Sequence, residues 1–236
     1  ENTTQKIVIS NLGGTIIQFI IKDVNKDDID VVLGHQHAED YLENVGTLGA
    51  IVGRHANRIE NAYVIINNVK YDLEVNHFHN NLHTGKNGLQ YKLFDVTQTD
   101  DSLILKTKVN HLEDGFPGNL DVTITYTLKH DTLHITYDAL SDEDTIVNLT
   151  NHSYFNLNGH DKENVYNHML YINSNHYMPN DKFSLVKKEI RCSQGTPFDF
   201  SNKKNIKESI QSEHEQVSLF NGIDHILTNS KVHNSI

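Results

Sequence analysis

Residues 121–140 read DVTITYTLKHDTLHITYDAL, and apolar and polar side chains alternate through both halves of this stretch. In the first half, Val122, Ile124 and Tyr126 share one face, while threonines occupy the other. Successive side chains of a β-strand point to opposite faces of a sheet, so this period of two predicts a strand buried on one side. The second half repeats the pattern, and residues 129–131 suit a turn. We therefore predict a β-hairpin.

Similar short runs of β-branched and aromatic residues occur on both sides of this hairpin. They predict further strands at 6–9, 15–21, 63–66, 69–73 and 103–109. Asn67 and Asn68 suit a two-residue hairpin turn, because asparagine tolerates the positive φ that such a turn requires. Helix signals are limited to 37–42 and 205–211. This pattern favours an all-β fold, a large antiparallel β-sandwich with few short helices. No linker or repeat is visible, and we expect one domain over residues 1–236.

Composition excludes several classes of protein. No run of about 18 apolar residues is present, so we expect no membrane span. The net charge of −11 and the lack of a Lys/Arg cluster argue against nucleic acid as a partner. Cys192 is the single cysteine, which excludes an internal disulfide and suggests a reducing, cytoplasmic location. Composition predicts no oligomeric state.

Histidine is abundant, with 16 residues against two methionines and no tryptophan. Three histidines lie in the loop 77–85 (HFHNNLHTG), and a fourth lies in 148–159 (NLTNHSYFNLNG). If 148–156 is a strand, amide, hydroxyl, imidazole and phenol groups share one face of it. Leu149, Phe155 and Leu157 are then expected on the side toward the core. Such a polar face makes a poor core but suits a sugar, whose hydroxyls need donors and acceptors.

A third polar segment, 53–59 (GRHANRI), has two arginines four residues apart. Guanidinium groups bind hydroxyls or carboxylates of a ligand, but a buried arginine equally often bonds backbone carbonyls of a turn. The residues alone leave both roles open for Arg54 and Arg58.

In this order along the chain, five segments resemble the aldose 1-epimerases, also called galactose mutarotases. The resemblance rests on 53–59 (GRHANRI), 81–85 (NLHTG), 148–157 (NLTNHSYFNL), 196–200 (TPFDF) and 222–225 (GIDH). Each motif is weak by itself, whereas the ordered set spans nearly the whole chain. The resemblance implies that family's β-sandwich and an enzyme of carbohydrate metabolism, an isomerase that interconverts the α and β anomers of free hexoses without cofactor or metal.

The resemblance also implies a site. His152 matches the family's general acid at the sugar ring oxygen, and His83 matches a second histidine beside that oxygen. Substrate-binding positions are matched by four residues: Asn57, Arg58, Tyr154 and Asp224. Thr84 departs from the family, which usually has Leu-His-Gly-Gly at this point.

The family's general base is a glutamate well beyond the position of Asp224, and the chain ends at Ile236 before it. We therefore expect the domain to lack its C-terminal part and the 236-residue chain alone to have little or no activity. The terminal residues 229–236 add to this expectation, because they do not read as the end of a fold. Glu74 and Asp199 are carboxylates within the chain, and nothing in the sequence favours either as a substitute base.

Two alternatives remain. One is a non-catalytic sugar-binding domain on the same scaffold. The other is a cupin-type metalloprotein that uses His77, His79 and His83, because imidazole is a good ligand for zinc, iron or nickel. The cupin pattern expects a glutamate shortly after its first two histidines, and none occurs between His79 and His83.

Overall fold

The computed structural model describes residues 1–162 and 164–229, and these two stretches form two compact units. Residues 230–236, which contributed to the expectation of a missing C-terminal part, lie outside the described residues. The expected single domain over 1–236 stays a prediction, since each unit is described separately. The described residues contain no helix that is both long and apolar enough to cross a bilayer.

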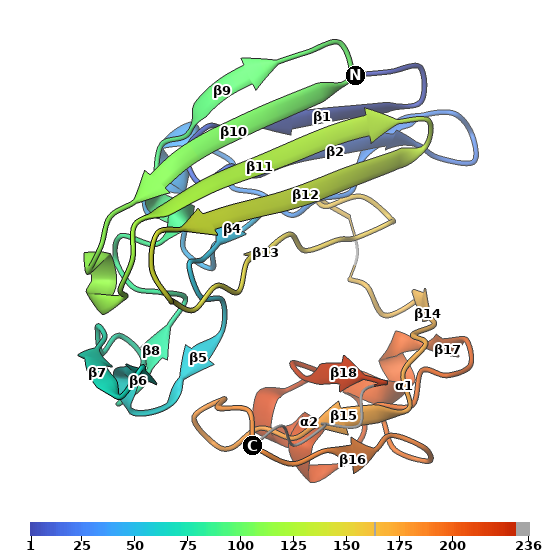
Figure 1. The fold of residues 1–236 in the computed structure, drawn as a ribbon. Helices are drawn as coiled ribbons and strands as arrows, with labels where there is room; N and C mark the ends of the chain where they lie inside the picture. Colours follow the sequence, from blue (N-terminus) through green and yellow to red (C-terminus); the bar gives the residue numbers. More distant parts are fainter. Residues whose placement is uncertain (163, 230–236) are drawn as a thin grey trace. The chain divides into compact units, whose positions relative to one another are not determined.

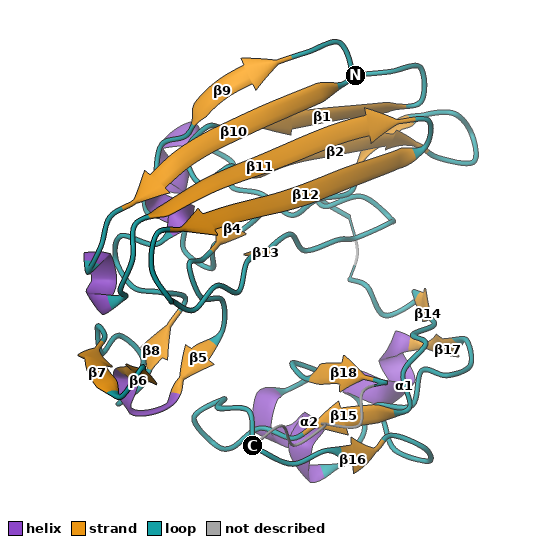
Figure 2. Cartoon of the chain, viewed as in Figure 1, coloured by secondary structure: helices purple, strands orange, loops and turns teal. Residues whose placement is uncertain are grey.

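The first unit is built almost entirely from antiparallel strands (Figures 1 and 2). Its strands are β1 Gln5–Ile9, β2 Ile16–Lys22, β3 Asp28–Asp30, β4 Ile51–Val52, β5 Arg58–Ile59, β6 Tyr63–Ile66, β7 Val69–Asp72, β8 Asn81–Leu82, β9 Asp95–Gln98, β10 Ser102–Val109, β11 Leu120–Lys129, β12 Thr132–Ser141 and β13 Thr150–Asn151. Four 3-10 turns lie at Ala38–Tyr41, Glu60–Ala62, Leu89–Tyr91 and Glu113–Gly115. The largest sheet has the order β12-β11-β10-β9, and β1-β2-β3 and β4-β13 form smaller sheets.

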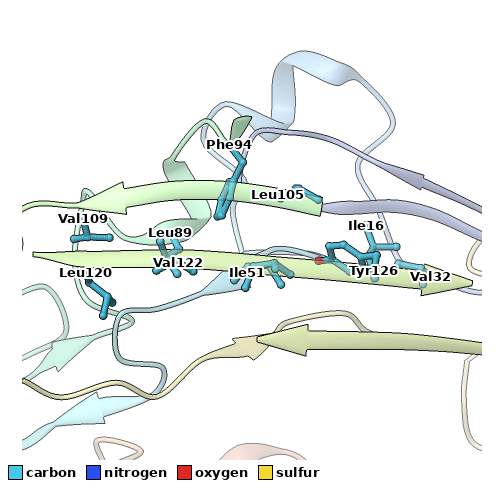
Figure 3. Packing of buried hydrophobic residues seen from close by; sticks show 11 residues of the cluster. Ile16, Val32, Ile51, Leu89, Phe94, Leu105, Val109, Leu120, Val122 and Tyr126 are labelled. Carbon is cyan, nitrogen blue, oxygen red and sulfur yellow. The ribbon is translucent and has the colours of Figure 1, made fainter. Parts of the chain in front are cut away.

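The alternation in 121–140 produces the predicted hairpin. Val122, Ile124 and Tyr126 are at most 2% exposed, whereas the threonines between them are half-buried. These side chains pack against Ile16 and Ile51 from the smaller sheets, so the core lies between two layers of strands (Figure 3). The all-β sandwich prediction is confirmed for this unit.

The other predicted hairpins are also present. β1 pairs with β2, and β6 pairs with β7 around Asn67 and Asn68, whose φ angles are 51° and 62°. The predicted helix at 37–42 is a single 3-10 turn, Ala38–Tyr41. In 148–156 the strand is shorter than expected, because β13 covers two residues. Of the expected core side chains in this segment, Leu149 packs against the core, but Phe155 and Leu157 are 51% and 60% exposed.

The second unit holds short strands and two short helices. These are β14 Met169–Leu170, β15 His176–Met178, β16 Arg191–Cys192, β17 Lys204–Asn205, β18 Ile226–Thr228, α1 Ile206–Ile210 and α2 Glu215–Phe220. The helix predicted at 205–211 is α1, and Asn205 caps it by accepting the Lys207 N–H. The sequence pattern did not predict α2, which buries Val217 against Tyr177 and Phe198.

Candidate active site

His83 lies just after β8, where the backbone turns away from its partner strand. β5 and β8 pair at Arg58↔Leu82 and Ile59↔Asn81. The next three residues, 83–85, have φ angles of 53°, 74° and 129°, so the chain leaves the ladder immediately. The His83 N–H still donates to the Asn57 carbonyl at 3.0 Å. The turn therefore places the imidazole beside the segment 55–58.

A backbone hydrogen bond fixes the tautomer of the His83 ring. The Asn57 N–H donates to Nδ1 of His83 at 3.0 Å. A nitrogen that accepts a hydrogen bond carries no proton, so the neutral ring holds its proton on Nε2. His83 consequently presents an N–H donor from the far side of the ring.

The same surroundings keep His83 neutral. Burial is the main reason that the pKa of His83 is lowered to about 4, and the neighbouring His152 and Arg58 contribute to this shift. A protonated ring would also lose the acceptor that Asn57 uses. At neutral pH, His83 is thus a hydrogen-bond donor without a charge.

His152 follows β13 and faces His83. Its N–H donates to the Ala50 carbonyl at 2.8 Å, and its carbonyl accepts the Gly49 N–H at 3.1 Å, so β4 and its preceding turn hold the backbone. The ring centroids of His83 and His152 are 5.4 Å apart and the planes are nearly perpendicular, at 86°. On the other side, the Tyr154 ring lies 5.2 Å from His152, tilted by 57°. Two imidazoles and a phenol therefore line one small area of the first unit.

Asn57 and Arg58 border the same area. Arg58 donates from its NH1 group to the Asn57 side-chain oxygen at 3.3 Å, and its Nε lies 3.4 Å from Nδ1 of His77. Burial lowers the pKa of His77, and the Arg58 charge adds to this effect. These hydrogen bonds orient the Arg58 guanidinium beside Asn57 and His77, and its charge acts on the nearby His83 ring.

Arg54 has the structural role that the sequence left open, in which a buried arginine bonds backbone carbonyls. It is completely buried and donates to the Pro117 and Gly118 carbonyls at 2.6 and 3.0 Å and to the Thr145 hydroxyl at 3.1 Å. A guanidinium fork with several fixed donors suits such a set of acceptors. Arg54 therefore stabilises turns of the scaffold, and Arg58 is the arginine that lies at the site.

Three asparagines that the sequence did not distinguish tie the site segments together. Asn81 donates to the Glu74 and Thr84 carbonyls, Asn148 to the Ala56 carbonyl, and Asn151 to the Gly49 carbonyl, at 2.8–3.1 Å. An asparagine next to a two-residue strand is the signal that could have identified them, because so short a ladder leaves carbonyls to be satisfied by side chains.

Asp224 lies in the second unit, where its carboxylate is exposed. Its backbone is held on both sides: the Asn180 amide donates to the Asp224 carbonyl at 2.7 Å, and the Asp224 N–H lies 3.2 Å from Nδ1 of His225. His225 is packed against Phe198, and burial lowers its pKa. Hydrogen bonds and ring packing thus hold the backbone of Asp224 and the side chain of His225 in this motif.

The histidine-rich loop does not form a metal site. Across residues 1–162 and 164–229, no group of three or more His, Cys, Asp or Glu side chains is arranged to hold a metal ion. His77, His79 and His83 are all among these residues, so the structure removes the basis of the cupin alternative.

Of the six residues expected at the site, five come together in the first unit. His83, His152, Tyr154, Asn57 and Arg58 form one cluster through the ring contacts and hydrogen bonds given above. Such a cluster offers an uncharged donor, a second imidazole, a guanidinium and an aromatic face. These groups suit a polar ligand with several hydroxyls and a reaction that moves protons near neutral pH.

Comparisons with known proteins agree with this chemistry. Residues 1–236 match the model of the family described as "Aldose 1-epimerase". The chain is 34% identical to galactose mutarotase of Pongo abelii over 220 residues, which is 93% of this chain and 63% of that protein. It is 31% identical to aldose 1-epimerase of Escherichia coli K12 over 227 residues, or 95% of this chain and 65% of that protein. The chain thus spans less than two thirds of the length of these relatives.

A solved structure is also similar. Galactose 1-epimerase from Lactobacillus acidophilus superimposes with a TM-score of 0.87 at 28% sequence identity. The match covers 98% of this chain and 69% of that one.

Proposed function

Because the chain belongs to the aldose 1-epimerase family, we propose that the protein is a hexose mutarotase. It interconverts the α and β anomers of a free hexose such as glucose or galactose. The single observation that carries this proposal is the pair of imidazoles of His83 and His152, whose centroids are 5.4 Å apart. The family's name alone would not assign a role to any residue, whereas this pair offers two groups to one sugar oxygen.

The reaction needs two proton transfers. A base removes the proton of the C1 hydroxyl, the bond between C1 and the ring oxygen breaks, and an acid gives a proton to that oxygen. Rotation about C1–C2 followed by the reverse steps yields the other anomer. In this proposal His152 is the general acid, as the family resemblance implies.

His83 has a different role from His152 because it stays neutral. Its Nε2–H donates a hydrogen bond to the ring oxygen, and it carries no charge that would oppose protonation of His152. Arg58 and Asn57 bind sugar hydroxyls, and the Tyr154 ring lies along the C–H face of the sugar. For Asp224, the family resemblance implies a role in binding sugar hydroxyls, and this role stays a prediction. For the base, the family resemblance implies a glutamate beyond residue 236.

Polarimetry of freshly dissolved α-glucose and α-galactose tests this function. The protein is assayed as the 236-residue chain and with any sequence that its gene encodes after Ile236. We expect the longer form to accelerate mutarotation, with dependence on both His83 and His152.

Two results would separate the alternatives. Hexose binding without acceleration by the longer form would contradict the proposal and support a non-catalytic sugar-binding domain. Full acceleration by the 236-residue chain would overturn the assignment of the base, because the catalytic carboxylate would then lie within the chain.

For the cellular location, we propose the cytoplasm. The lone cysteine, Cys192, is exposed and free, as is common in a reducing compartment. Fractionation of cells that express the protein tests this location.

A further inference from the structure

Thr84 adopts a conformation that its side chain disfavours. Its φ is 74°, although it is β-branched, and it is 1% exposed. A positive φ is a genuine outlier for a β-branched residue and persists only where the surroundings hold it in place. Glycine would adopt the same backbone conformation without this cost. The side chain of Thr84 must therefore contribute something that a glycine cannot.

The Thr84 hydroxyl is bonded to the backbone of His55. Its Oγ1 accepts the His55 N–H at 2.9 Å and donates to the His55 carbonyl at 3.3 Å. The Thr84 carbonyl in turn accepts the Asn81 side-chain amide at 2.8 Å, an interaction that is fully buried. Thr84 is therefore fixed to the segment on one side of the turn and to β8 on the other.

These bonds continue the β5–β8 ladder after the backbone has left it. The strand register ends at Arg58↔Leu82, and one further main-chain bond joins the His83 N–H to the Asn57 carbonyl. Beyond that point the N–H groups of Asn57 and His55 donate to side chains instead. Asn57 donates to His83 Nδ1, and His55 donates to Thr84 Oγ1. The second of these bonds lies next to the first and holds the same two segments together.

We propose that Thr84 is a positioning residue for His83: its hydroxyl anchors the 83–85 turn to His55, so that Asn57 bonds His83 Nδ1 and the ring keeps its proton on Nε2. The benefit of this arrangement for catalysis rests on the function proposed above for His83. The arrangement itself does not depend on that function.

The test is the protonation of the His83 ring, observed by NMR in the 236-residue chain with ¹⁵N-labelled histidine. Long-range ¹H–¹⁵N spectra distinguish the two neutral tautomers of each ring, and H83N identifies the His83 signals. In the wild type we expect one tautomer, Nε2–H, and a titration midpoint near pH 4, in keeping with the burial of the ring.

Three substitutions separate the hydroxyl from the backbone. T84S keeps the hydroxyl, T84V keeps the shape but not the hydroxyl, and T84G removes the hydroxyl together with the backbone strain. We expect T84S to match the wild type. T84V and T84G should show a mixture of tautomers and a midpoint raised by about one pH unit, because the ring loses a fixed donor and gains access to water.

A T84G variant that folds and keeps the single tautomer and the low midpoint would overturn the proposal, even if T84V does not fold. So would a T84S variant that behaves like T84G, since the hydroxyl would then not be the cause. Neither readout requires sugar turnover. A failure of mutarotase activity would therefore contradict the proposed function without affecting this result, and the reverse also holds.

Discussion

The β11–β12 hairpin and the segments around His83 and His152 differ in the groups that form hydrogen bonds with their backbone N–H and C=O groups. β11 pairs with β12 along its whole length, from Leu120↔Ser141 to Lys129↔Thr132. The strands next to the two histidines, β8 and β13, pair over two residues each. There, side-chain hydrogen bonds of Asn81, Thr84 and Asn151 to nearby backbone groups complete what the ladders leave open.

This difference has a physical basis. A long ladder forces side chains to alternate strictly between two faces, which suits a core but spaces them at fixed intervals. The imidazoles of His83 and His152, whose centroids are 5.4 Å apart, come from β-strand ends that are distant in sequence. Short ladders closed by side chains allow the backbone to turn there, as it does at 83–85. The predictions below test this division.

The largest effect should come from removing either imidazole. In a form of the protein with activity, H152N and H83N should each lower kcat about 10²–10⁴-fold, because H152N removes the proposed general acid and H83N removes the proposed hydrogen-bond donor to the sugar ring oxygen. Asparagine keeps an acceptor in place of Nδ1, so the fold should be retained. NMR exchange between sugar anomers measures the rate. H134N, at an exposed position on β12, is the matched control; an equal loss in H134N would contradict the assignment.

The second effect concerns stability where a side chain, rather than a β-ladder, provides the hydrogen bonds to backbone carbonyls. R54M should lower the free energy of unfolding by about 3 kcal/mol, because the buried carbonyls of Pro117 and Gly118 lose their donor. Urea unfolding followed by circular dichroism measures it. The control is R191M, which removes exposed ion pairs with Glu189 and Glu215 and should cost less than about 1 kcal/mol. An equal loss of unfolding free energy in R54M and R191M would show that the hydrogen bonds of Arg54 are dispensable.

The third effect is a dependence of stability on pH. His83 is neutral in both states at pH 7, but below pH 6.5 the unfolded chain binds a proton that the folded ring, with a pKa of about 4, does not. The free energy of unfolding should therefore decrease as pH falls from about 6.5 to about 4, by about 1–2 kcal/mol after allowance for partial exposure. Unfolding of H83N over the same range should show a smaller decrease. An identical decrease would mean that another group is responsible.

In the long-ladder region, one polar group reaches across the core. The Tyr126 hydroxyl, on a residue that is 2% exposed, donates to the Gly14 carbonyl at 2.7 Å. Y126F should lower the free energy of unfolding by about 1–2 kcal/mol, since it leaves that buried carbonyl without its donor. Thermal and urea unfolding measure the change. No measurable loss would indicate that water replaces the hydroxyl.

The smallest effect should occur on the outer face of the same strand. T125V changes a half-buried threonine that pairs with Thr136 on β12 and lies away from the core. We expect a change within about 0.5 kcal/mol, because the backbone ladder is unaffected. The same urea experiment measures it. A loss as large as that of Y126F would show that the outer face contributes as much as the core.

Much of the scaffold was predictable because it depends on local rules. The alternation of apolar and polar residues predicted the hairpins β1–β2, β6–β7 and β11–β12, and Asn67 and Asn68 predicted a turn. The signal failed where structure depends on distant partners. Phe155 and Leu157 are exposed although apolar, and α2 forms because Val217 packs against Tyr177 and Phe198, which lie 19 and more residues away in the sequence.

The candidate site was likewise predictable only in part. The motifs named the residues, but they could not separate the roles of two arginines four positions apart, since burial decides the role and burial is a tertiary property. They also gave no role to Thr84, whose hydroxyl meets His55 only once β5 and β8 have paired.

The sequence by itself determined the class of fold, the faces of the long strands and the residue types available for proton transfer, because the period of two and the side-chain chemistry are local. The tertiary structure alone decided that His83 and His152 meet, that His83 stays neutral with its proton on Nε2, and that Arg54 is buried while Arg58 lies at the site. These outcomes arise from desolvation and from hydrogen bonds between segments about 25 to 100 residues apart, which no local pattern specifies.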